Sequence, residues 1–268
     1  MTATQHTTSG IAYDREGPTG DLTVVLVHAG VADRRMWQPL WDDLIRDRDV
    51  VRVDLRGFGE SVERPRGPLS PVDDVLDTLT ALGIARCHLV GASFGAGVAV
   101  EFALLRPDLV VSLLLCAPGG SLIAQRTPDL TAFGEAERAA LAADDLEAAV
   151  EANLHWWVDS PHRHGAAVDA DVRALVGRMQ RLAFEVTADW DDVEEVELDP
   201  PALDRLGEIR CPTTVLVGGD DLDAIHVAAR AVAGGIPGAR RVDWPDTAHL
   251  PSLERPEDFV ALVREGIS

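Results

Sequence analysis

The sequence GASFG at residues 91–95 places the tightest constraint on how this chain folds. The apolar residues before it, 87–90, predict a buried strand, and the residues after it predict a helix that ends near Arg106, before Pro107. Glycine at positions 91 and 95 permits a turn in which a side chain would collide with neighbouring backbone. The pattern predicts that Ser93 occupies a strained strand-to-helix turn, with its hydroxyl raised above the edge of a sheet.

Apolar runs alternate with amphipathic stretches on both sides of this turn. We expect further strands at residues 22–27, 49–55, 110–116, 213–217 and 240–244, and further helices at 36–46, 71–82, 225–233 and 256–265. Strands and helices that alternate in this way produce right-handed crossovers and a parallel sheet. The predicted fold class is therefore α/β, with a mostly parallel sheet flanked by helices.

Between residues 121 and 206 the strand-like runs disappear. This stretch is rich in Ala, Glu, Asp and Arg at helical spacing, and we interpret it as a helical lid or cap. The lid would interrupt one core domain, whose two parts are residues 1–120 and 207–268. The first ten residues are polar and have no pattern, which predicts disorder there.

The formal net charge of −21 argues against two classes of partner. A phosphate backbone requires a basic surface, and an anionic membrane face repels an acidic protein, so we expect neither nucleic acid nor membrane as a partner. No stretch is long and apolar enough to span a bilayer. The first residues contain no apolar signal core, and a cytoplasmic location is expected.

Composition also limits the chemistry. The chain contains no lysine, which excludes a lysine nucleophile or Schiff base. Cys87, Cys116 and Cys211 are too few and too far apart for a disulfide framework or a zinc site, so buried free thiols are expected. His162 and His164 have no evident third ligand. We therefore predict no metal and no cofactor.

A serine hydroxyl is a weak nucleophile at neutral pH and needs a base. His249 lies in the loop directly after the last expected strand, which places it at the same sheet edge as Ser93. The base needs a carboxylate to orient it, and the loop after the strand at 213–217 supplies one. Asp221 is our first choice for this acid, and the adjacent Asp220 is the alternative.

Acyl transfer also needs N–H donors for the developing oxyanion. The backbone N–H of Phe94 is one candidate. The second comes from the loop after the first strand, where Gly30 is the candidate and Val31 the alternative. In the insertion, Trp156 and Trp157 are candidate substrate-binding residues; packing within the lid is the other interpretation of both.

Together these motifs resemble the α/β-hydrolase family, in its esterase and lactonase branch, and are most similar to enol-lactonase-type and small carboxylesterase-type members. Residues 28–30 are similar to the family's oxyanion loop, and residues 54–61 match its structural D-x-R-G-x-G-x-S turn. Ser93, Asp221 and His249 match the family's nucleophile, acid and base. The resemblance covers nearly the whole chain outside the insertion.

The resemblance implies hydrolysis of a small-molecule carboxylic ester or lactone through an acyl-enzyme on Ser93. The same residues in this fold also perform carbon–carbon bond hydrolysis and cofactor-free perhydrolysis of the haloperoxidase type, and these alternatives stay open. A third interpretation is a small-molecule binder that kept the fold and lost its chemistry, against which the intact Ser, His and Asp set argues.

Overall fold

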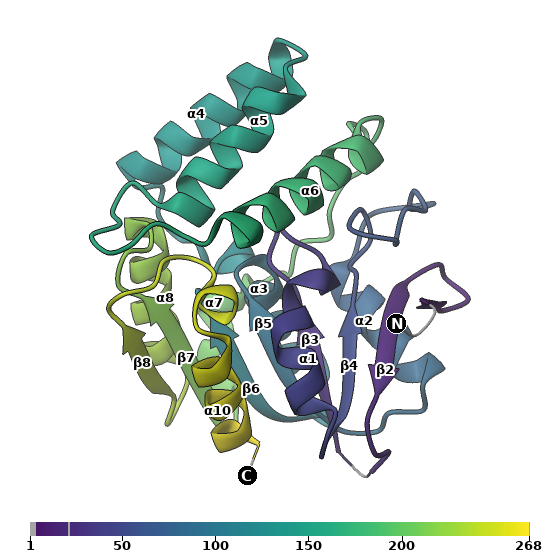
Figure 1. The fold of residues 1–268 in the computed structure, drawn as a ribbon. Helices are drawn as coiled ribbons and strands as arrows, with labels where there is room; N and C mark the ends of the chain where they lie inside the picture. Colours follow the sequence, from purple (N-terminus) through teal and green to yellow (C-terminus); the bar gives the residue numbers. More distant parts are fainter. Residues whose placement is uncertain (1–3, 21, 268) are drawn as a thin grey trace.

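An eight-stranded sheet forms the centre of the computed structural model, which describes residues 4–20 and 22–267 (Figure 1). The strand order is β1-β2-β4-β3-β5-β6-β7-β8. All neighbours from β4 to β8 are parallel, whereas β1 and β2 pair antiparallel. The predicted α/β class with a mostly parallel sheet is confirmed.

The strands are β1 (Gln5–His6), β2 (Ala12–Glu16), β3 (Thr23–Val27), β4 (Asp49–Val53), β5 (Cys87–Ala92), β6 (Val110–Cys116), β7 (Thr213–Gly218) and β8 (Arg240–Trp244). Those in the middle of the sheet are rich in Val and Leu, because helices cover both of their faces. Their observed bounds differ from the expected ones by two residues or fewer.

Strands β1 and β2 were not predicted, and the expectation of disorder at the first ten residues is wrong for the part that the structure describes. Residues 1–3 lie outside the described part, but Gln5 and His6 pair with Tyr13 and Ala12. Strand β1 forms the edge of the sheet, and β2 lies between β1 and β4, with only Ala12 and Tyr13 paired to β1. Polar side chains are tolerated at such an edge. Hydrophobic periodicity therefore does not reveal them.

Helices cover both faces of the sheet, as Figure 1 shows: α1 (Gln38–Leu44) and α10 (Pro256–Gly266) lie on one face, and α2 (Pro71–Ala81), α3 (Phe94–Leu105) and α8 (Asp223–Gly235) on the other. The helix expected at 36–46 is instead a 3-10 turn, η1 (Arg34–Trp37), followed by α1. The side chain of Asp33 caps η1 by accepting the backbone N–H of Arg35, which starts the turn earlier than the apolar pattern suggests. The short α9 (Pro251–Glu254) precedes α10.

Between β6 and β7 the chain forms an insertion made of helices and loops. Its elements are η2 (Gly120–Leu122), α4 (Pro128–Ala142), α5 (Leu146–Asn153), the π-helix η3 (Leu154–Asp159), α6 (Ala170–Thr187), α7 (Ala202–Arg205) and η4 (Leu206–Glu208). Helices α4, α5 and α6 lie beyond one end of the strands, at the top of Figure 1. Helix α7 returns to contact η2 and α3, so the chain leaves and rejoins the core at neighbouring points.

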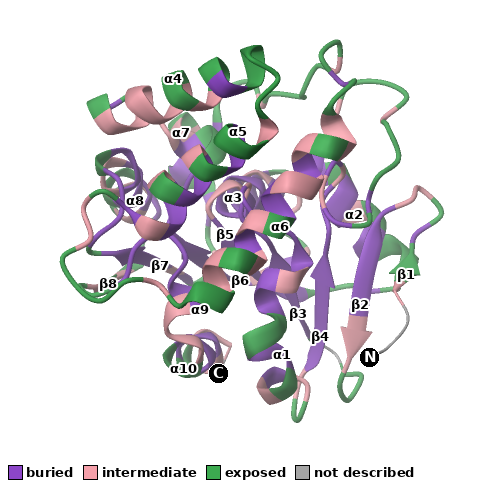
Figure 2. Cartoon of the chain, turned by 45° about the horizontal axis from the view of Figure 1, so that its top comes forward, coloured by how far each residue is buried: buried purple, intermediate pink, exposed green. Residues whose placement is uncertain are grey.

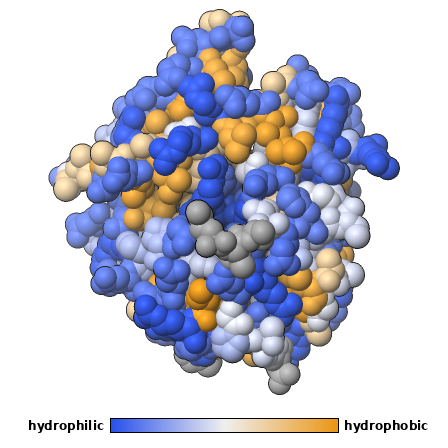
Figure 3. Space-filling view, turned by 45° about the vertical axis from the view of Figure 1, so that its right-hand side comes forward, coloured by the Kyte–Doolittle hydropathy of each residue, from blue (hydrophilic) through white to orange (hydrophobic). Residues whose placement is uncertain are grey.

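The core follows the sheet. Figure 2 shows the central strands buried and the outward sides of the helices exposed, with α4, α5 and α6 more exposed than the rest. In Figure 3 most of the surface turned toward the reader is hydrophilic, in keeping with the large net negative charge. Among the described residues, no helix has the length and apolar character needed to cross a membrane.

Candidate active site

Ser93 lies in the turn between β5 and α3, with φ +52° and ψ −114°. Few side-chain-bearing residues adopt this conformation, which costs on the order of 1–3 kcal/mol. Two glycines make room for the turn. A Cβ at Gly91 would lie 2.2 Å from the carbonyl oxygen of Gly95, and a Cβ at Gly95 would lie 2.4 Å from that of His28. The backbone N–H of Ser93 donates to the carbonyl oxygen of Cys116 at 2.8 Å, which fixes the serine over the carboxyl end of β6.

The structure brings His249 and Asp221 to this serine. His249 Nε2 lies 2.7 Å from Ser93 Oγ, and His249 Nδ1 lies 3.0 and 2.9 Å from the two carboxylate oxygens of Asp221. Since an ionised carboxylate only accepts, the imidazole proton sits on Nδ1, and Nε2 accepts the serine hydroxyl. His249 and Asp221 are each 2% exposed, whereas Ser93 at the other end of this chain of hydrogen bonds is partly exposed.

The loops that carry Asp221 and His249 pack backbone against backbone. A Cβ at Gly218 would lie 2.1 Å from the carbonyl oxygen of Ala248, and a Cβ at Gly219 would lie 2.5 Å from that of Pro245. The backbone N–H of Gly219 donates to Trp244 at 2.8 Å. The Gly-Gly pair is therefore required for the two loops to approach closely enough for their side chains to meet.

Asp220 and Asp221 face opposite ways. The carbonyl oxygen of Asp220 accepts the hydroxyl of Ser160, and its carboxylate accepts the backbone N–H of His164 at 3.4 Å. Both partners belong to the insertion. Asp221 instead faces His249, and one of its oxygens also accepts the backbone N–H of Leu222 at 2.8 Å. The geometry therefore separates the two candidates for the acid: only Asp221 contacts the imidazole.

The two tryptophans of the insertion also differ. The Trp157 ring lies against the His249 ring, with centroids 4.5 Å apart, and it is 7% exposed. Its other neighbour is Phe133, at 5.0 Å and nearly perpendicular. Trp156 is only partly buried and contacts the ring of His155. Of the two candidates for substrate binding, Trp157 is therefore the one that lies beside His249.

The predicted oxyanion loop lies next to the serine turn. As the first residue of α3, Phe94 has a backbone N–H with no acceptor inside its helix. A Cβ at Gly30 would lie 3.4 Å from the Cβ of Phe94, so the Gly30 backbone runs directly beside that helix start. The preceding N–H, that of Ala29, already donates to the sulfur of Met36 at 3.3 Å. Gly30 and Val31 remain the two candidates for the second donor.

His28 has a structural position. Its Nε2 accepts the backbone N–H of Leu55 at 3.0 Å, so its proton sits on Nδ1, which donates to the carbonyl oxygen of Ala29 at 2.9 Å. Burial lowers the pKa of His28, which keeps the ring neutral. The neutral imidazole uses both nitrogens in hydrogen bonds, and in this way it joins the predicted oxyanion loop to the loop that begins after β4.

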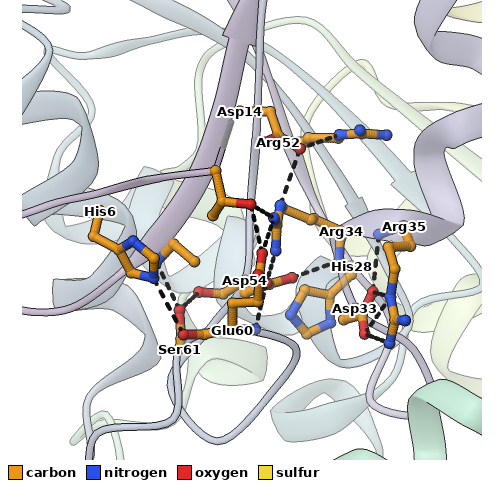
Figure 4. A network of polar contacts seen from close by, with 12 residues as sticks. His6, Asp14, His28, Asp33, Arg34, Arg35, Arg52, Asp54, Glu60 and Ser61 are labelled. Atoms are coloured by element: carbon orange, nitrogen blue, oxygen red, sulfur yellow. Dashed lines mark hydrogen bonds and ion pairs between the residues drawn. The ribbon is translucent and has the colours of Figure 1, made fainter. Parts of the chain in front are cut away.

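A buried ion-pair network supports the same region, and its central residue was not among the residues predicted from sequence. Figure 4 shows Arg34 between Asp14 and Asp54, with Glu60 beside them. Arg34 Nε donates to Asp14 Oδ2 at 3.0 Å, and its Nη1 and Nη2 donate to Asp54 and Glu60. Asp54 is the first residue of the D-x-R-G-x-G-x-S turn. Arg34 lies twenty residues earlier, and nothing in the sequence around it predicts that it pairs with this turn.

A second serine–histidine pair lies at the opposite ends of the parallel strands from Ser93. Ser112 Oγ and His88 Nδ1 are 2.8 Å apart, where the two residues pair across β5 and β6. Burial lowers the pKa of His88. This pair stands at the amino ends of the parallel strands, far along the sheet from the elbow. It provides an internal comparison for the Ser93 site.

A thiol near the site is not poised for chemistry. Cys116 ends β6, and burial raises the pKa of its thiol well above the ordinary value. Burial also raises the pKa of Cys87 to about 12. Among the described residues, no group of three or more His, Cys, Asp and Glu side chains is arranged to hold a metal ion.

The insertion contacts the loops of both Asp221 and His249, a feature that the sequence analysis did not predict. Arg163 Nη1 donates to Glu254 Oε2 at 2.8 Å, and Glu254 Oε1 accepts the backbone N–H of Ala248 at 2.9 Å. Arg163 and Glu254 are 91 residues apart in sequence. No local pattern could have joined them.

Comparison with known proteins places this geometry in context. A family model described as the alpha/beta hydrolase family matches residues 24–262. The chain is 28% identical over 261 residues to strigolactone esterase D14 of Arabidopsis thaliana, an alignment that covers 93% of each protein. A thermophilic esterase from Thermogutta terrifontis is similar in structure, with a TM-score of 0.74, 27% identity, and coverage of 99% of this chain and 97% of that one. A structure titled as an N-acyl homoserine lactone degrading enzyme has a TM-score of 0.74 and 25% identity, covering 95% of this chain and 96% of that one.

Proposed function

This chain belongs to the alpha/beta hydrolase family, and we propose that it cleaves a small-molecule carboxylic ester or lactone through an acyl-enzyme on Ser93. The observation that carries the proposal is the unbroken chain of contacts from Asp221 through His249 to Ser93 Oγ. Serine hydrolysis needs a nucleophile, a base within hydrogen-bond reach and a group that orients the base, and each has its counterpart here.

In the first half of the reaction, Ser93 Oγ attacks the carbonyl carbon while His249 Nε2 takes the hydroxyl proton. Asp221 holds the imidazole in the required tautomer and stabilises its charged form. The N–H groups of Phe94 and Gly30 would donate to the oxyanion, and the N-terminal end of α3 adds a favourable dipole. His249 then gives its proton to the leaving alcohol, which leaves the acyl group on the serine.

In the second half, water enters and His249 takes its proton, so that the resulting hydroxide attacks the acyl carbonyl. The second oxyanion collapses, the carboxylic acid leaves, and the proton returns to Ser93. In a lactone the leaving hydroxyl stays attached to the acyl group, so the product is a single hydroxy acid. The esterase and lactonase relatives support both substrate types.

We further propose that the insertion at residues 121–206 acts as a lid and that Trp157 borders the substrate pocket. The Trp157 ring lies against the His249 ring at a tilt of 44°, so we expect a substrate that reaches Ser93 to pass beside its indole. Trp156 would shape the pocket less directly, because it lies against His155. Insertions over the carboxyl ends of the strands commonly shape binding sites in α/β folds.

The test compares the wild type with Ser93→Ala and with Ser112→Ala, the matched change in the other serine–histidine pair. With p-nitrophenyl acetate, Ser93→Ala should lose measurable turnover, while Ser112→Ala keeps it. A fluorophosphonate probe should label the wild type and Ser112→Ala, and mass spectrometry should place the label on Ser93. Turnover retained in folded Ser93→Ala would refute the mechanism, and a folded wild type that neither turns over nor takes the label would favour a binding protein.

A further inference from the structure

Arg163 joins the insertion to the core through a guanidinium that is almost out of solvent. The side chains of Arg163 and Glu254 are 10% and 11% exposed. Arg163 Nη1 donates to Glu254 Oε2 at 2.8 Å. Its remaining donors bind the insertion itself: Nε reaches the carbonyl oxygen of Asp159 at 2.8 Å, and Nη2 that of Val158 at 3.1 Å. One planar group therefore binds both the C-terminal end of η3 and a core carboxylate.

Glu254 extends this contact to the loop of the base. While Oε2 binds Arg163, Oε1 accepts the backbone N–H of Ala248 at 2.9 Å. Ala248 directly precedes His249, so this hydrogen bond restrains the backbone from which the imidazole projects. Both oxygens of Glu254 are thus used, one toward the insertion and one toward the histidine loop. Glu254 cannot reorient without releasing one of them.

The insertion also touches the imidazole itself, six residues before Arg163. The Trp157 ring lies 4.5 Å from the His249 ring. Between these two points, the hydroxyl of Ser160 donates to the carbonyl oxygen of Asp220, beside the acid. The stretch from Trp157 to Arg163 therefore contacts the ring of His249 and the loop of Asp221, and it reaches the backbone of Ala248 through Glu254.

We propose that Arg163 and Glu254 are positioning residues that hold His249 within reach of Ser93 Oγ when the insertion is seated on the core. The inference rests on the proposed function, because it concerns the same base. Without the Arg163–Glu254 ion pair, the side chain that accepts the N–H of Ala248 is no longer anchored to the insertion, and fewer molecules have His249 Nε2 aligned with the serine. In this scheme neither residue touches substrate. Their loss therefore lowers kcat and the rate of serine labelling while KM changes little.

The experiment uses the full chain with Arg163→Gln, Glu254→Gln and the double variant. Glutamine at 254 keeps an oxygen for the N–H of Ala248 but loses the ion pair, which makes it the conservative change. Arg173→Gln is the matched control, because Arg173 pairs with Asp159 and Glu151 inside the insertion and does not bind Glu254. Far-UV circular dichroism and thermal unfolding check that each variant is folded.

For p-nitrophenyl acetate, we expect each single change to lower kcat about tenfold, since small displacements of a catalytic group have effects of this size. KM should stay within about twofold of the wild type. Labelling of Ser93 by the fluorophosphonate should slow by the same factor as kcat. The double variant should lose no more than the worse single variant, because both changes break one connection. Arg173→Gln should keep kcat and the labelling rate.

Two results would overturn the inference: folded Arg163→Gln and Glu254→Gln with the same kcat as Arg173→Gln, or a rise in KM with unchanged kcat. If Arg163→Gln does not fold, Glu254→Gln alone decides between these outcomes. Failure of the proposed function looks different: either Ser93→Ala keeps the turnover of the wild type, or the wild type itself neither turns over nor takes the label, whatever the other variants do.

Discussion

The carboxylate of Asp221 meets the imidazole of His249 with both oxygens, 3.0 and 2.9 Å from Nδ1, while the neighbouring Asp220 turns toward the insertion. Asp221→Asn should leave the fold intact and lower kcat about 10⁴-fold, because an amide can donate to Nδ1 and force the proton onto Nε2. Asp220→Asn keeps an oxygen for its partner in the insertion and should leave kcat nearly unchanged. Steady-state kinetics with an activated ester measures both. A larger loss of kcat in Asp220→Asn than in Asp221→Asn would show that Asp220, and not Asp221, is the acid.

Gly95→Ala should destabilise the protein severely. The new Cβ would lie 2.4 and 2.5 Å from the carbonyl oxygens of His28 and Val27, both of which are backbone atoms that cannot rotate away. Overpacking of this kind should lower the free energy of unfolding by about 3 kcal/mol or more. Urea unfolding followed by tryptophan fluorescence measures it. Gly67→Ala is the control, because its Cβ meets open space, and equal midpoints for the two variants would disprove the prediction.

Replacing Arg34 with methionine should also destabilise the fold, through charge. The guanidinium is the buried counterion of Asp54, whose side chain is fully out of solvent. Burial raises the pKa of Asp54, and without Arg34 nothing of comparable strength opposes that rise. The free energy of unfolding should fall by about 3–5 kcal/mol at pH 7. Arg46→Met removes an exposed ion pair with Asp43 and should change the unfolding midpoint little; an equal loss in both variants would contradict the expectation.

Asp74 should impose its own pH dependence on stability. Burial raises its pKa from 3.8 to about 6, even though its carboxylate accepts the backbone N–H of Arg56 at 2.8 Å. The folded state therefore favours the protonated form. The protonated Asp74 side chain makes its full contribution to the free energy of unfolding below the ordinary pKa of 3.8, and this contribution is lost as the pH rises through about 6.

Asp74→Asn cannot ionise and should escape this loss. Relative to the wild type, its free energy of unfolding should increase by about 2–3 kcal/mol between pH 4 and pH 7.5. Urea unfolding at several pH values gives the difference between the two curves. Curves that run parallel across this range would show that Asp74 ionises freely in the folded protein.

Local pattern sufficed for the parts of the fold that are buried on both sides. The run of Val and Leu in β6 predicted its bounds to the residue, because a central strand is apolar at most of its positions. The sequence of β2, AYDRE, reads as polar, and it forms a strand because β4 offers it an antiparallel edge. That partner lies more than thirty residues away, so the pairing leaves no local trace.

Some residues of the site were also predictable from the sequence, and others were not. Chain order placed Ser93 and His249 at the carboxyl ends of β5 and β8, and parallel strands bring such ends to one edge. Chain order could not choose between Asp220 and Asp221, because adjacent residues point in opposite directions and the insertion decides which is used elsewhere. The Arg163–Glu254 contact depends on how two distant segments pack, and packing of this range has no signature in spacing or periodicity.

Because η2 and α7 are neighbours in space, the chain departs from the core and comes back to it across a narrow gap. Closing a loop grows more costly only slowly as the loop lengthens, so this gap tolerates segments of very different size. We therefore expect the core to accept insertions of other lengths between β6 and β7 without a change in its own fold. By this inference, a replacement segment that brings no cation to Glu254 would leave His249 less well positioned, so turnover would fall even where the rest of the protein folds as before.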